Sequence, residues 1–574
     1  MAQTGLQPQT TMQFLGVNLH QDPLTLADQE MIRAINADFH TMPGTCLLRR
    51  GRSVLFETPL ILTPVSRLAK INAKRYQVAA NRLFRDQQSI ASDVNTTTLT
   101  TFAALKPLTD PTTWAFIANG AFMRKDNGTT LAKWGLDAPT SAPVIAALGG
   151  GALTGDYSIV YTYARKVGTA LAHESNPSPA SNTVTLSSQG ITATALNTPT
   201  DSQITHIRVY RTLANADGLW LFETEVAASV TGGTLGIADS ELGSAVEFDN
   251  DPPPTAPFIV EYQGSLFLLT QNNVYWSKRY RPESVPPENF VQISSPSDPL
   301  TCGVSVAGSL GVFTRATKYR VTGDTINGFI PIEALSKRGT TSPAALVASE
   351  QGAIFPALDG VFATNFISED QRLSAQVDPL FFGETVQDYL PINLAAAHTF
   401  AAEVYKQRYY LAYAEQGFSL PNKVAVFSFE TKHWYFYDHP VASLLGESDT
   451  GLLTAGSMDG LVYILEDGTT DHGADISFEA ITKDYFGGSP FQKKLFFSIR
   501  LDLDTRGEDV TVAVYIDGIL KRTAAFNSSR SRGRFRLPEG TIGYTWRVKI
   551  TYTGHQRLAW YGALAQWVPL EVAA

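Results

Sequence analysis

The sequence predicts an all-β protein: a β-propeller, an Ig- or fibronectin-like β-sandwich inserted into it, and a C-terminal β-region. Glycine, proline, threonine, tyrosine and phenylalanine are abundant, and long stretches rich in alanine, glutamate and lysine are absent. This composition favours strands and turns over helices. Pairs of apolar strands joined by tight turns recur along the chain. Successive turns lie about 38 to 44 residues apart, which is the period of a four-stranded propeller blade.

The recurring hairpins are the clearest of these observations. Each consists of an apolar strand, a turn rich in Asn, Asp or Gly, and a second strand with an aromatic residue. The examples are 76–84, 116–122, 266–276, 354–362 and 452–463. Asn-Gly and Asp-Gly supply the positive φ angles that two-residue hairpin turns require. The gap between Asp359 and Asp459 fits two steps of the period. Unrelated hairpins in ordinary sandwiches are the alternative interpretation.

Residues 1–53 are predicted to form an N-terminal extension with one short helix. The segment Thr25-Leu-Ala-Asp28 has the form of a capping box, in which the threonine side chain satisfies a free backbone N–H at a helix start. The apolar residues that would share one face of this helix are Met31, Ile32 and Ile35. The helix is expected to end near Asn36.

The propeller pattern is interrupted once. The first blades are expected in 54–135 and the remaining blades in 258–475, and prolines mark both edges of the segment between them. Within that segment Tyr157, Ile159 and Tyr161 alternate as a half-buried strand requires. Residues 136–257 are therefore predicted to form a separate sandwich inserted into a surface loop. From Ile476 onward the candidate strands are longer and lack the blade spacing, which predicts a sandwich-like region over 476–574.

Charge and cysteine content exclude several classes of protein. The formal net charge of −9 argues against a simple nucleic-acid binder. Residues 493–557 nevertheless carry 13 Lys and Arg against 6 Asp and Glu, so this part is expected to face a different partner. Cys46 and Cys302 are expected to be buried thiols, not a disulfide or zinc site. With no secretory signal and no apolar run of membrane length, the chain is expected to be soluble and made in a cytoplasm, without stable membrane insertion.

No catalytic, metal-binding or cofactor-binding residues are predicted. A glycosidase propeller needs two paired carboxylates, and the sequence does not pair the single acids Glu403, Asp438 and Asp459. The histidines lack metal-site spacing. The acidic cluster of Asp502, Asp504, Glu508 and Asp509 does not complete a calcium loop. The sequence therefore predicts a structural or interaction protein and not an enzyme.

An alternating run of arginines is the sharpest charged feature. If its segment is a strand, the four side chains lie on one face. They are Arg530, Arg532, Arg534 and Arg536. Guanidinium groups pair well with phosphates and with carboxylates, so this stripe is a candidate contact for a neighbouring subunit, an adaptor or DNA, with a solvated face as the alternative. A second basic run, Arg49, Arg50 and Arg52, is a further candidate of the same kind.

The opening of the chain resembles that of a known family. The motifs appear in the following order: Gly16-Val-Asn-Leu19, Asp22-Pro23-Leu24, Ile35-Asn36-Ala-Asp38-Phe39, Pro43-Gly44 and Leu47-Leu-Arg49-Arg50-Gly51. Similar motifs also occur in the predicted insertion: Tyr157–Tyr163, Glu174–Ser178 and Val209–Thr212. This order is similar to that of tail nozzle proteins of short-tailed bacteriophages, also described as tail tubular protein B or packaged-DNA stabilisation proteins.

The resemblance implies a structural virion component. Such a chain would assemble with copies of itself into a ring of six below the portal and adaptor proteins, beside tail fibres or spikes. The ring would form the distal conduit for double-stranded DNA, retain the packaged genome and open for ejection. A virion receptor-binding or baseplate protein that recognises host surface glycans is the main alternative. A carbohydrate-active propeller enzyme is a third.

Overall fold

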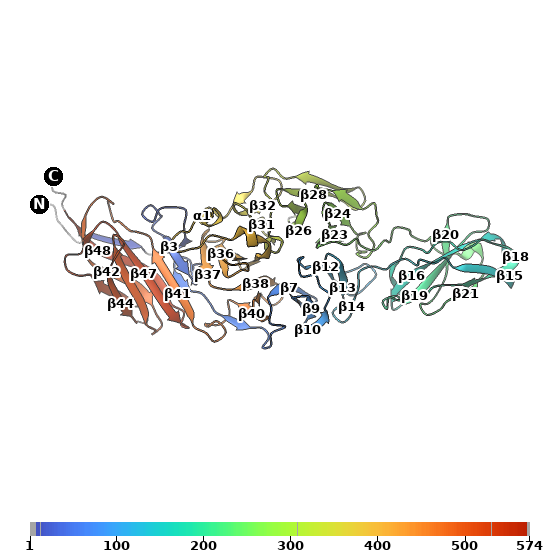
Figure 1. Ribbon diagram of the computed structural model, residues 1–574, viewed down its shortest axis with the longest axis horizontal. Coiled ribbons are helices and arrows are strands. Elements are labelled where there is room, and N and C mark those ends of the chain that lie inside the picture. The colour runs from blue at the N-terminus through green and yellow to red at the C-terminus, as the bar shows by residue number, and fades with distance from the viewer. Residues whose placement is uncertain (1–6, 12, 307, 528, 530, 571–574) are drawn as a thin grey trace. The chain divides into compact units, whose positions relative to one another are not determined.

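The computed structural model describes residues 7–11, 13–306, 308–527, 529 and 531–570 (Figure 1). Strands dominate this part of the chain, so the all-β prediction is confirmed. Its helical segments are short: α1 (Asp378–Phe381) and the 3-10 turns η1 (Asp239–Glu241), η2 (Pro343–Ala345) and η3 (Leu394–Thr399). Cys46 and Cys302 are both buried and free. Burial raises the pKa of the Cys302 thiol to about 12, so the thiol stays protonated near neutrality.

Seven sheets contain a blade of four antiparallel strands each, and these blades follow one another along the described chain. Blades one and two are β7 (Val65–Ile71), β8 (Lys74–Ala79), β9 (Arg82–Arg85), β10 (Gln88–Ala91), and β11 (Thr101–Leu105), β12 (Trp114–Asn119), β13 (Phe122–Asp126), β14 (Leu131–Lys133). Blades three and four are β22 (Phe258–Tyr262), β23 (Ser265–Leu269), β24 (Asn273–Trp276), β25 (Phe290–Gln292), and β26 (Leu300–Val306), β27 (Ser309–Thr314), β28 (Lys318–Asp324), β29 (Gly328–Glu333). This connectivity is that of propeller blades.

The last three blades have the same strand order. Blades five and six are β30 (Val347–Ser349), β31 (Gly352–Ala357), β32 (Gly360–Thr364), β33 (Gln371–Arg372), and β34 (Ala401–Tyr405), β35 (Arg408–Tyr413), β36 (Lys423–Ser428), β37 (Trp434–Tyr437). Blade seven is β38 (Val441–Glu447), β39 (Leu452–Ser457), β40 (Val462–Leu465) and an early strand, β6 (Arg52–Val54). The fourth strand of the last blade therefore comes from the beginning of the chain, with Leu465 opposite Arg52.

The segment between β14 and β22 forms a sandwich of two sheets. One sheet has the order β15 (Val144–Tyr157), β18 (Val184–Thr194), β21 (Gly233–Leu235). The other has the order β17 (Ala170–Glu174), β16 (Ile159–Val167), β19 (His206–Thr212), β20 (Trp220–Ala227). Alternating residues of β16 and β19 bury their side chains between the sheets, among them Tyr161 and Ile207. This core belongs to the insertion alone.

A second sandwich combines strands from both ends of the sequence. One sheet has the order β4 (Ala37–Asp38), β5 (Cys46–Leu48), β48 (Ala559–Pro569), β42 (Lys494–Asp504), β45 (Ser531–Arg536), with β1 (Gln7–Thr11) on β48 and β46 (Ile542–Gly543) on β42. The other contains β2 (Gly16–Val17), β3 (Glu30–Ile35), β41 (Ile476–Thr482), β47 (Trp546–Gly554), β43 (Val510–Ile516), β44 (Ile519–Phe526). The described residues among the first 53 are therefore part of this sandwich and of blade seven, which corrects the predicted N-terminal extension.

The predicted helix after Thr25 is wrong. Thr25 lies in a turn, where its hydroxyl donates to the carbonyl of Asp22. The apolar residues that suggested a helical face form β3, a strand that is buried on both faces. A short apolar run of this kind fits a buried strand as well as a helix, and sequence periodicity alone does not separate the two. Pairing on both sides decides the outcome here, because β3 runs parallel to β2 and antiparallel to β41.

The early strands join blade six to the sandwich. β2 pairs with β37, with Val17 opposite Trp434, so one sheet of ten strands runs from β34 through β2 and β3 to β44. Gly16 permits this approach. A Cβ atom there would lie 2.5 Å from the Cβ of His433, and its φ of +150° is one that other residues rarely adopt.

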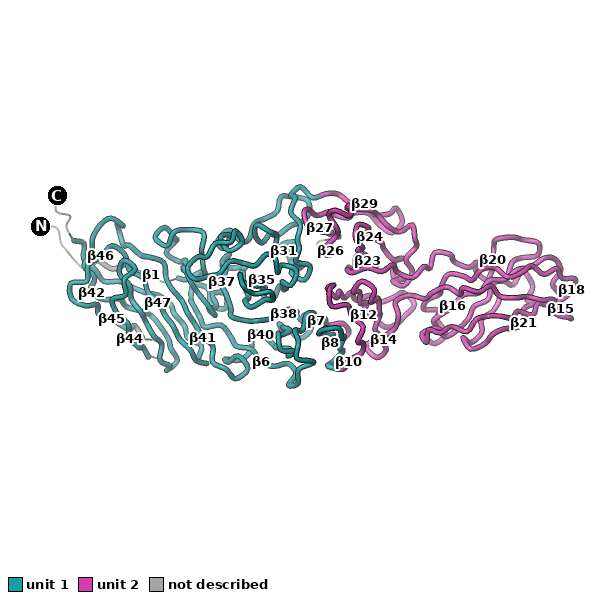
Figure 2. Tube along the Cα trace, viewed as in Figure 1, with its two compact units in different colours: residues 1–69, 76–87, 334–574 teal, residues 70–75, 88–333 magenta. Residues whose placement is uncertain are grey.

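The chain divides into two compact units (Figure 2). Unit 1 comprises 1–69, 76–87 and 334–574, and unit 2 comprises 70–75 and 88–333. In unit 1 the first strands of blades six and seven, β34 and β38, lie side by side. In unit 2, β22 lies beside both β11 and β26. Within each unit, neighbouring blades therefore meet along their first strands, as they do in propellers.

Candidate functional site: the arginine face of the sandwich

The predicted arginine stripe lies on β45, an edge strand of unit 1. Arg534 and Arg536 are exposed, and Phe535 between them is buried. This alternation places the two arginines on the outer face of the sheet. Arg532 lies opposite Asp502 in the strand register, and Arg530 falls outside the described residues.

A further arginine on the neighbouring strand was missed from the sequence. Arg500 of β42 is exposed and lies directly opposite Arg534. Like charges in this position repel one another. Arg534 donates from Nε to the Ser498 hydroxyl at 3.1 Å. In the part of the chain that the structure describes, the guanidinium groups of Arg500 and Arg536 have no ion-pair partner. We call Arg500, Arg534 and Arg536 the arginine face.

A hollow adjoins the arginine face between β42, β48 and β1. Its volume is about 240 Å³. Its lining residues are Thr10, Arg500, Leu501, Asp502, Gly562, Ala563 and Leu564. Arg500 thus stands at the edge of a partly apolar depression that also contains one carboxylate. Such a surface can accept an anionic group beside an apolar one.

Arg49, in contrast, is an internal residue, which corrects its place among the candidate contacts. It is 2% exposed. Its Nη1 and Nη2 donate to the two carboxylate oxygens of Asp471 at 2.9 and 2.6 Å, and its Nε donates to Asn36 Oδ1 at 2.8 Å. Asn36 also donates to the carbonyl of Ser477 at 2.7 Å and accepts from the backbone N–H of Asp438. Arg49 therefore links the segment between β5 and β6 to the segment between β40 and β41, and its guanidinium is unavailable to a partner.

The other two members of that run differ from Arg49. Arg50 is exposed. Arg52 lies on β6, and its guanidinium carbon is 4.4 Å from the centroid of the Tyr463 ring. The structure therefore brings Arg534 and Arg536 together with Arg500, while Arg49 and Arg50 lie between β5 and β6 and Arg52 begins β6 of blade seven.

Unit 2 contains a buried cluster of charges at the base of the insertion. Arg165 of β16 donates to Asp110 Oδ2 at 2.9 Å and to Glu283 Oε1 at 2.6 Å. Glu283 also pairs with Lys125 of β13. His173 of β17 lies in the same cluster. All five side chains are buried, and they link the insertion to blade two and to the loop after β24.

Burial and charge together set the ionisation of this cluster. Burial would raise the pKa of Glu283, but the charges of Lys125, His173 and Arg165 outweigh it and hold that pKa well below its usual range. Burial lowers the pKa of Lys125 to about 8. Burial also lowers the pKa of His173 to about 4, so this imidazole is neutral near pH 7. The cluster is internally paired and is a structural joint within unit 2.

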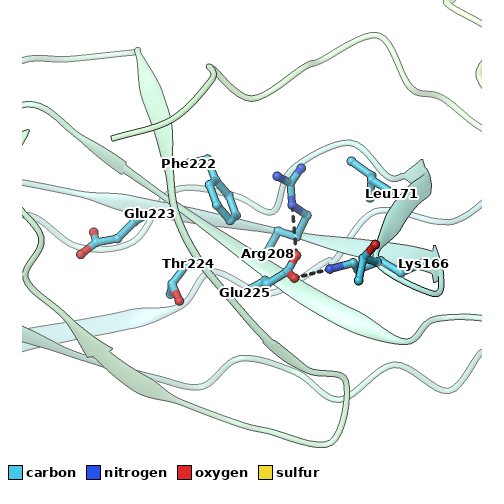
Figure 3. Close-up of a pocket in the computed structure, with 8 residues that line it drawn as sticks. Lys166, Leu171, Arg208, Phe222, Glu223, Thr224 and Glu225 are labelled. Carbon is cyan, nitrogen blue, oxygen red and sulfur yellow. Dashed lines mark hydrogen bonds and ion pairs between the residues drawn. The ribbon is translucent and has the colours of Figure 1, made fainter. Parts of the chain in front are cut away.

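A shallow pocket lies on the insertion (Figure 3). Lys166 and Arg208 point toward Glu225 in this view, and Phe222 lies beside Arg208. Lys166 pairs with Glu225, and Arg208 also donates to Glu174 Oε2 at 2.5 Å. The guanidinium of Arg208 stacks over Phe222, 4.3 Å from the ring centroid. These charged side chains already have partners within the chain. They are therefore less available to a ligand than the side chains of the arginine face.

The single acids named in the sequence each contact a group other than another carboxylate. Asp438 pairs with Lys423, and Asp459 accepts from the Ser457 hydroxyl. Glu403 Oε1 accepts from the backbone N–H of Val404 at 3.0 Å. Within the described ranges, no group of three His, Cys, Asp or Glu side chains could hold a metal ion. No helix in these ranges is long and apolar enough to cross a membrane.

Comparison with known proteins gives only distant likenesses. No family model and no curated protein matches the chain. Among solved structures, exo-beta-1,3-galactanase from Phanerochaete chrysosporium is 10% identical with a TM-score of 0.21, over 54% of this chain and 94% of that one. PorZ of the type-IX secretion system of Porphyromonas gingivalis is 11% identical with a TM-score of 0.20, over 93% of this chain and 87% of that one. Similarity this low carries no functional argument.

Proposed function

We propose that the chain is a structural component of a virion, the tail nozzle of a short-tailed bacteriophage. Copies of it form a ring, of six subunits by analogy with the family it resembles, below the portal and adaptor proteins. The ring conducts double-stranded DNA, retains the packaged genome and opens for ejection. The proposal includes no catalytic step and no cofactor.

One observation supports the proposal beyond the sequence resemblance. The early motif residues make internal contacts that connect parts of the chain far apart in sequence. Gly16 lets β2 approach β37, Asn36 bonds to strands on both sides, and Arg49 holds Asp471. Asp38 is fully buried and accepts from Arg557 at 2.8 Å. The sheet that contains β2 and β3 connects blade six to the sandwich through continuous backbone hydrogen bonds. This construction suits a part that must resist force, because deforming it requires breaking many of these bonds together.

The charge distribution supports a conduit with a separate docking surface. A channel for DNA must not bind phosphates tightly, since each neutralised phosphate adds affinity and would slow passage. The net charge of −9 agrees with this requirement. The arginine face is the local exception, and we assign it to contact with a neighbouring subunit or the adaptor.

Immunogold labelling of intact particles tests the proposal. An antibody against this chain should label the tip of the single tail vertex. Label distributed around the tail periphery would favour the receptor-binding alternative, whose proteins are usually peripheral. Absence of label from particles, with full recognition of the purified chain, would overturn the virion role and reopen the question of an enzyme.

A further inference from the structure

Three loops at one end of the C-terminal sandwich present large apolar side chains to solvent. They comprise residues 489–493, 517–520 and 542–545, which we call the apolar loop cluster. The exposed fractions are 87% for Phe491, 60% for Ile519, 51% for Leu520, 49% for Ile542 and 37% for Tyr544. Clustered exposure of this kind marks an interaction surface more often than single apolar residues do.

Hydrogen bonds hold the three loops together. The ammonium of Lys494, itself buried, donates to the carbonyls of Ser489 and Gln492 at 2.8 Å and of Tyr544 at 3.2 Å. Asp517 Oδ1 accepts from the backbone N–H groups of Tyr544 and Thr545, both at 2.8 Å. Ile519 follows directly on the Asp517-Gly518 turn, where both residues have positive φ. The apolar side chains are thus displayed on a fixed frame.

Cations follow the apolar residues of two of these loops closely in the sequence. Lys493 follows Phe491 by two residues, and its ammonium lies 6.0 Å from the centroid of the Tyr544 ring. Lys521 and Arg522 follow Leu520 directly. Within the three loops the acidic residue is Asp517, whose carboxylate is occupied by backbone N–H groups. The arginine face of the same sandwich adds further positive charge, although the chain as a whole is acidic.

We propose that the apolar loop cluster is a peripheral binding site for an anionic lipid bilayer. Apolar tips with cations one to two residues behind them match the layering of a membrane surface, in which acyl chains lie beneath negative headgroups. Tyr544, with its apolar ring and polar hydroxyl, suits the boundary between these layers. Separate protruding tips favour a deformable bilayer over the flat, closely packed core of a protein interface. The contact is reversible and involves no spanning segment.

Flotation of the purified full chain with vesicles tests this inference, independently of the virion role. The chain should float with phosphatidylcholine vesicles that contain phosphatidylglycerol, and much less with phosphatidylcholine alone. The triple variant Phe491→Ser, Ile519→Ser, Leu520→Ser should lose the bound fraction, since each apolar side chain is expected to contribute about tenfold in affinity. Lys493→Glu with Lys521→Glu should lower binding about tenfold or more.

A matched control distinguishes binding at this site from nonspecific hydrophobic binding to vesicles. Leu62, Ile326 and Leu335 are apolar residues elsewhere on the chain with exposed fractions of 83%, 91% and 72%, and the triple change of these to Ser should leave flotation unchanged. Thermal melts establish that each variant is folded. Absence of wild-type flotation would overturn the proposal. So would a loop-cluster variant that floats normally but no longer forms rings in sedimentation, which would assign the surface to a second copy of the chain.

Discussion

Lys125 and Arg165 of unit 2 lie in a buried cluster, whereas Arg500, Arg534 and Arg536 lie on an open sheet face. In the buried cluster each cation contacts a carboxylate that comes from a different part of the chain. On the arginine face two cations lie opposite one another. The first arrangement uses charge to fix the insertion to its neighbouring blades. The second leaves charge available to another molecule. Similar side chains therefore stabilise the fold in one region and are available to bind a partner in the other.

The largest expected effect comes from removing the shared carboxylate of the buried cluster. Glu283→Gln leaves Lys125 and Arg165 buried without their main counter-charge, and should lower the free energy of unfolding of unit 2 by about 3–5 kcal/mol. Denaturant unfolding followed by tryptophan fluorescence measures this change. Glu247→Gln, which affects a half-exposed acid in the same unit, should cost about 1 kcal/mol or less. Equal losses in the two variants would contradict the assigned role of the cluster.

A neighbouring pair of arginines tests whether burial separates structural from available charge. Arg49→Ala leaves Asp471 and Asn36 without their partner and should lower the free energy of unfolding by about 3 kcal/mol. Arg50→Ala removes an exposed side chain and should change it by about 0.5 kcal/mol or less. Chemical denaturation of both variants checks the difference. A costly Arg50→Ala change would show that exposure is a poor guide here.

Lowering the pH should reduce the stability contributed by the buried cluster before it affects the arginine face. The pKa of His173 is lowered to about 4 in the folded chain, against about 6.5 when unfolded. Between these values the unfolded state binds more protons, so stability falls as pH falls through this window. The expected loss is about 2 kcal/mol at about pH 5. Thermal melts across this range measure it, and His173→Phe should flatten the dependence. The lowered pKa values of Asp110 and Glu283 extend the loss to lower pH.

Changing the whole arginine stripe should affect assembly more than folding. With Arg530, Arg532, Arg534 and Arg536 all replaced by Ser, we expect the melting of the isolated chain to stay nearly unchanged, because Arg534 and Arg536 are exposed. Ring formation should weaken, as measured by analytical ultracentrifugation. Unchanged assembly would assign the stripe to solvent.

The smallest expected effect is an increase in the free energy of unfolding. Arg500→Ser removes the repulsion with Arg534 and should stabilise the isolated chain by about 0.2–0.5 kcal/mol at low salt. The gain should shrink as salt screens the pair. Denaturant titrations at two salt concentrations measure it. A loss of stability instead would mean that Arg500 has a structural partner.

Sequence reasoning identified the all-β class because hairpin turns are encoded locally. The turns at Asn119-Gly120, Asp359-Gly360 and Asp459-Gly460 each join the second and third strands of a blade. Blade four could not be recognised in this way, because its equivalent turn, at Arg315-Ala316, contains neither Asn-Gly nor Asp-Gly. The strand β3 was mistaken for a helix because its partners, β2, β37 and β41, are fixed by tertiary pairing that no local pattern records.

The candidate site was only partly predictable for the same reason. Alternation around Phe535 correctly indicates that Arg534 and Arg536 share a face. The same alternation in β42, where Ile499 and Leu501 are buried, could have identified Arg500 as exposed. The position of Arg500 opposite Arg534 could not be predicted, because a single sequence does not show the strand register between distant segments. The burial of Arg49 depends on Asp471, more than four hundred residues away.

The pairing of β1 with β48, and of β5 with β48, has a consequence for biogenesis. A ribosome adds about 5–20 residues per second, so these early strands wait roughly half a minute to two minutes for their partners to be made. During that time β37 can already pair with β2, and blade seven can already recruit β6, while β1 and β5 still lack their partner β48. The sandwich therefore cannot be completed before β48 has been made, and a chain truncated before β48 leaves β1 and β5 without this partner.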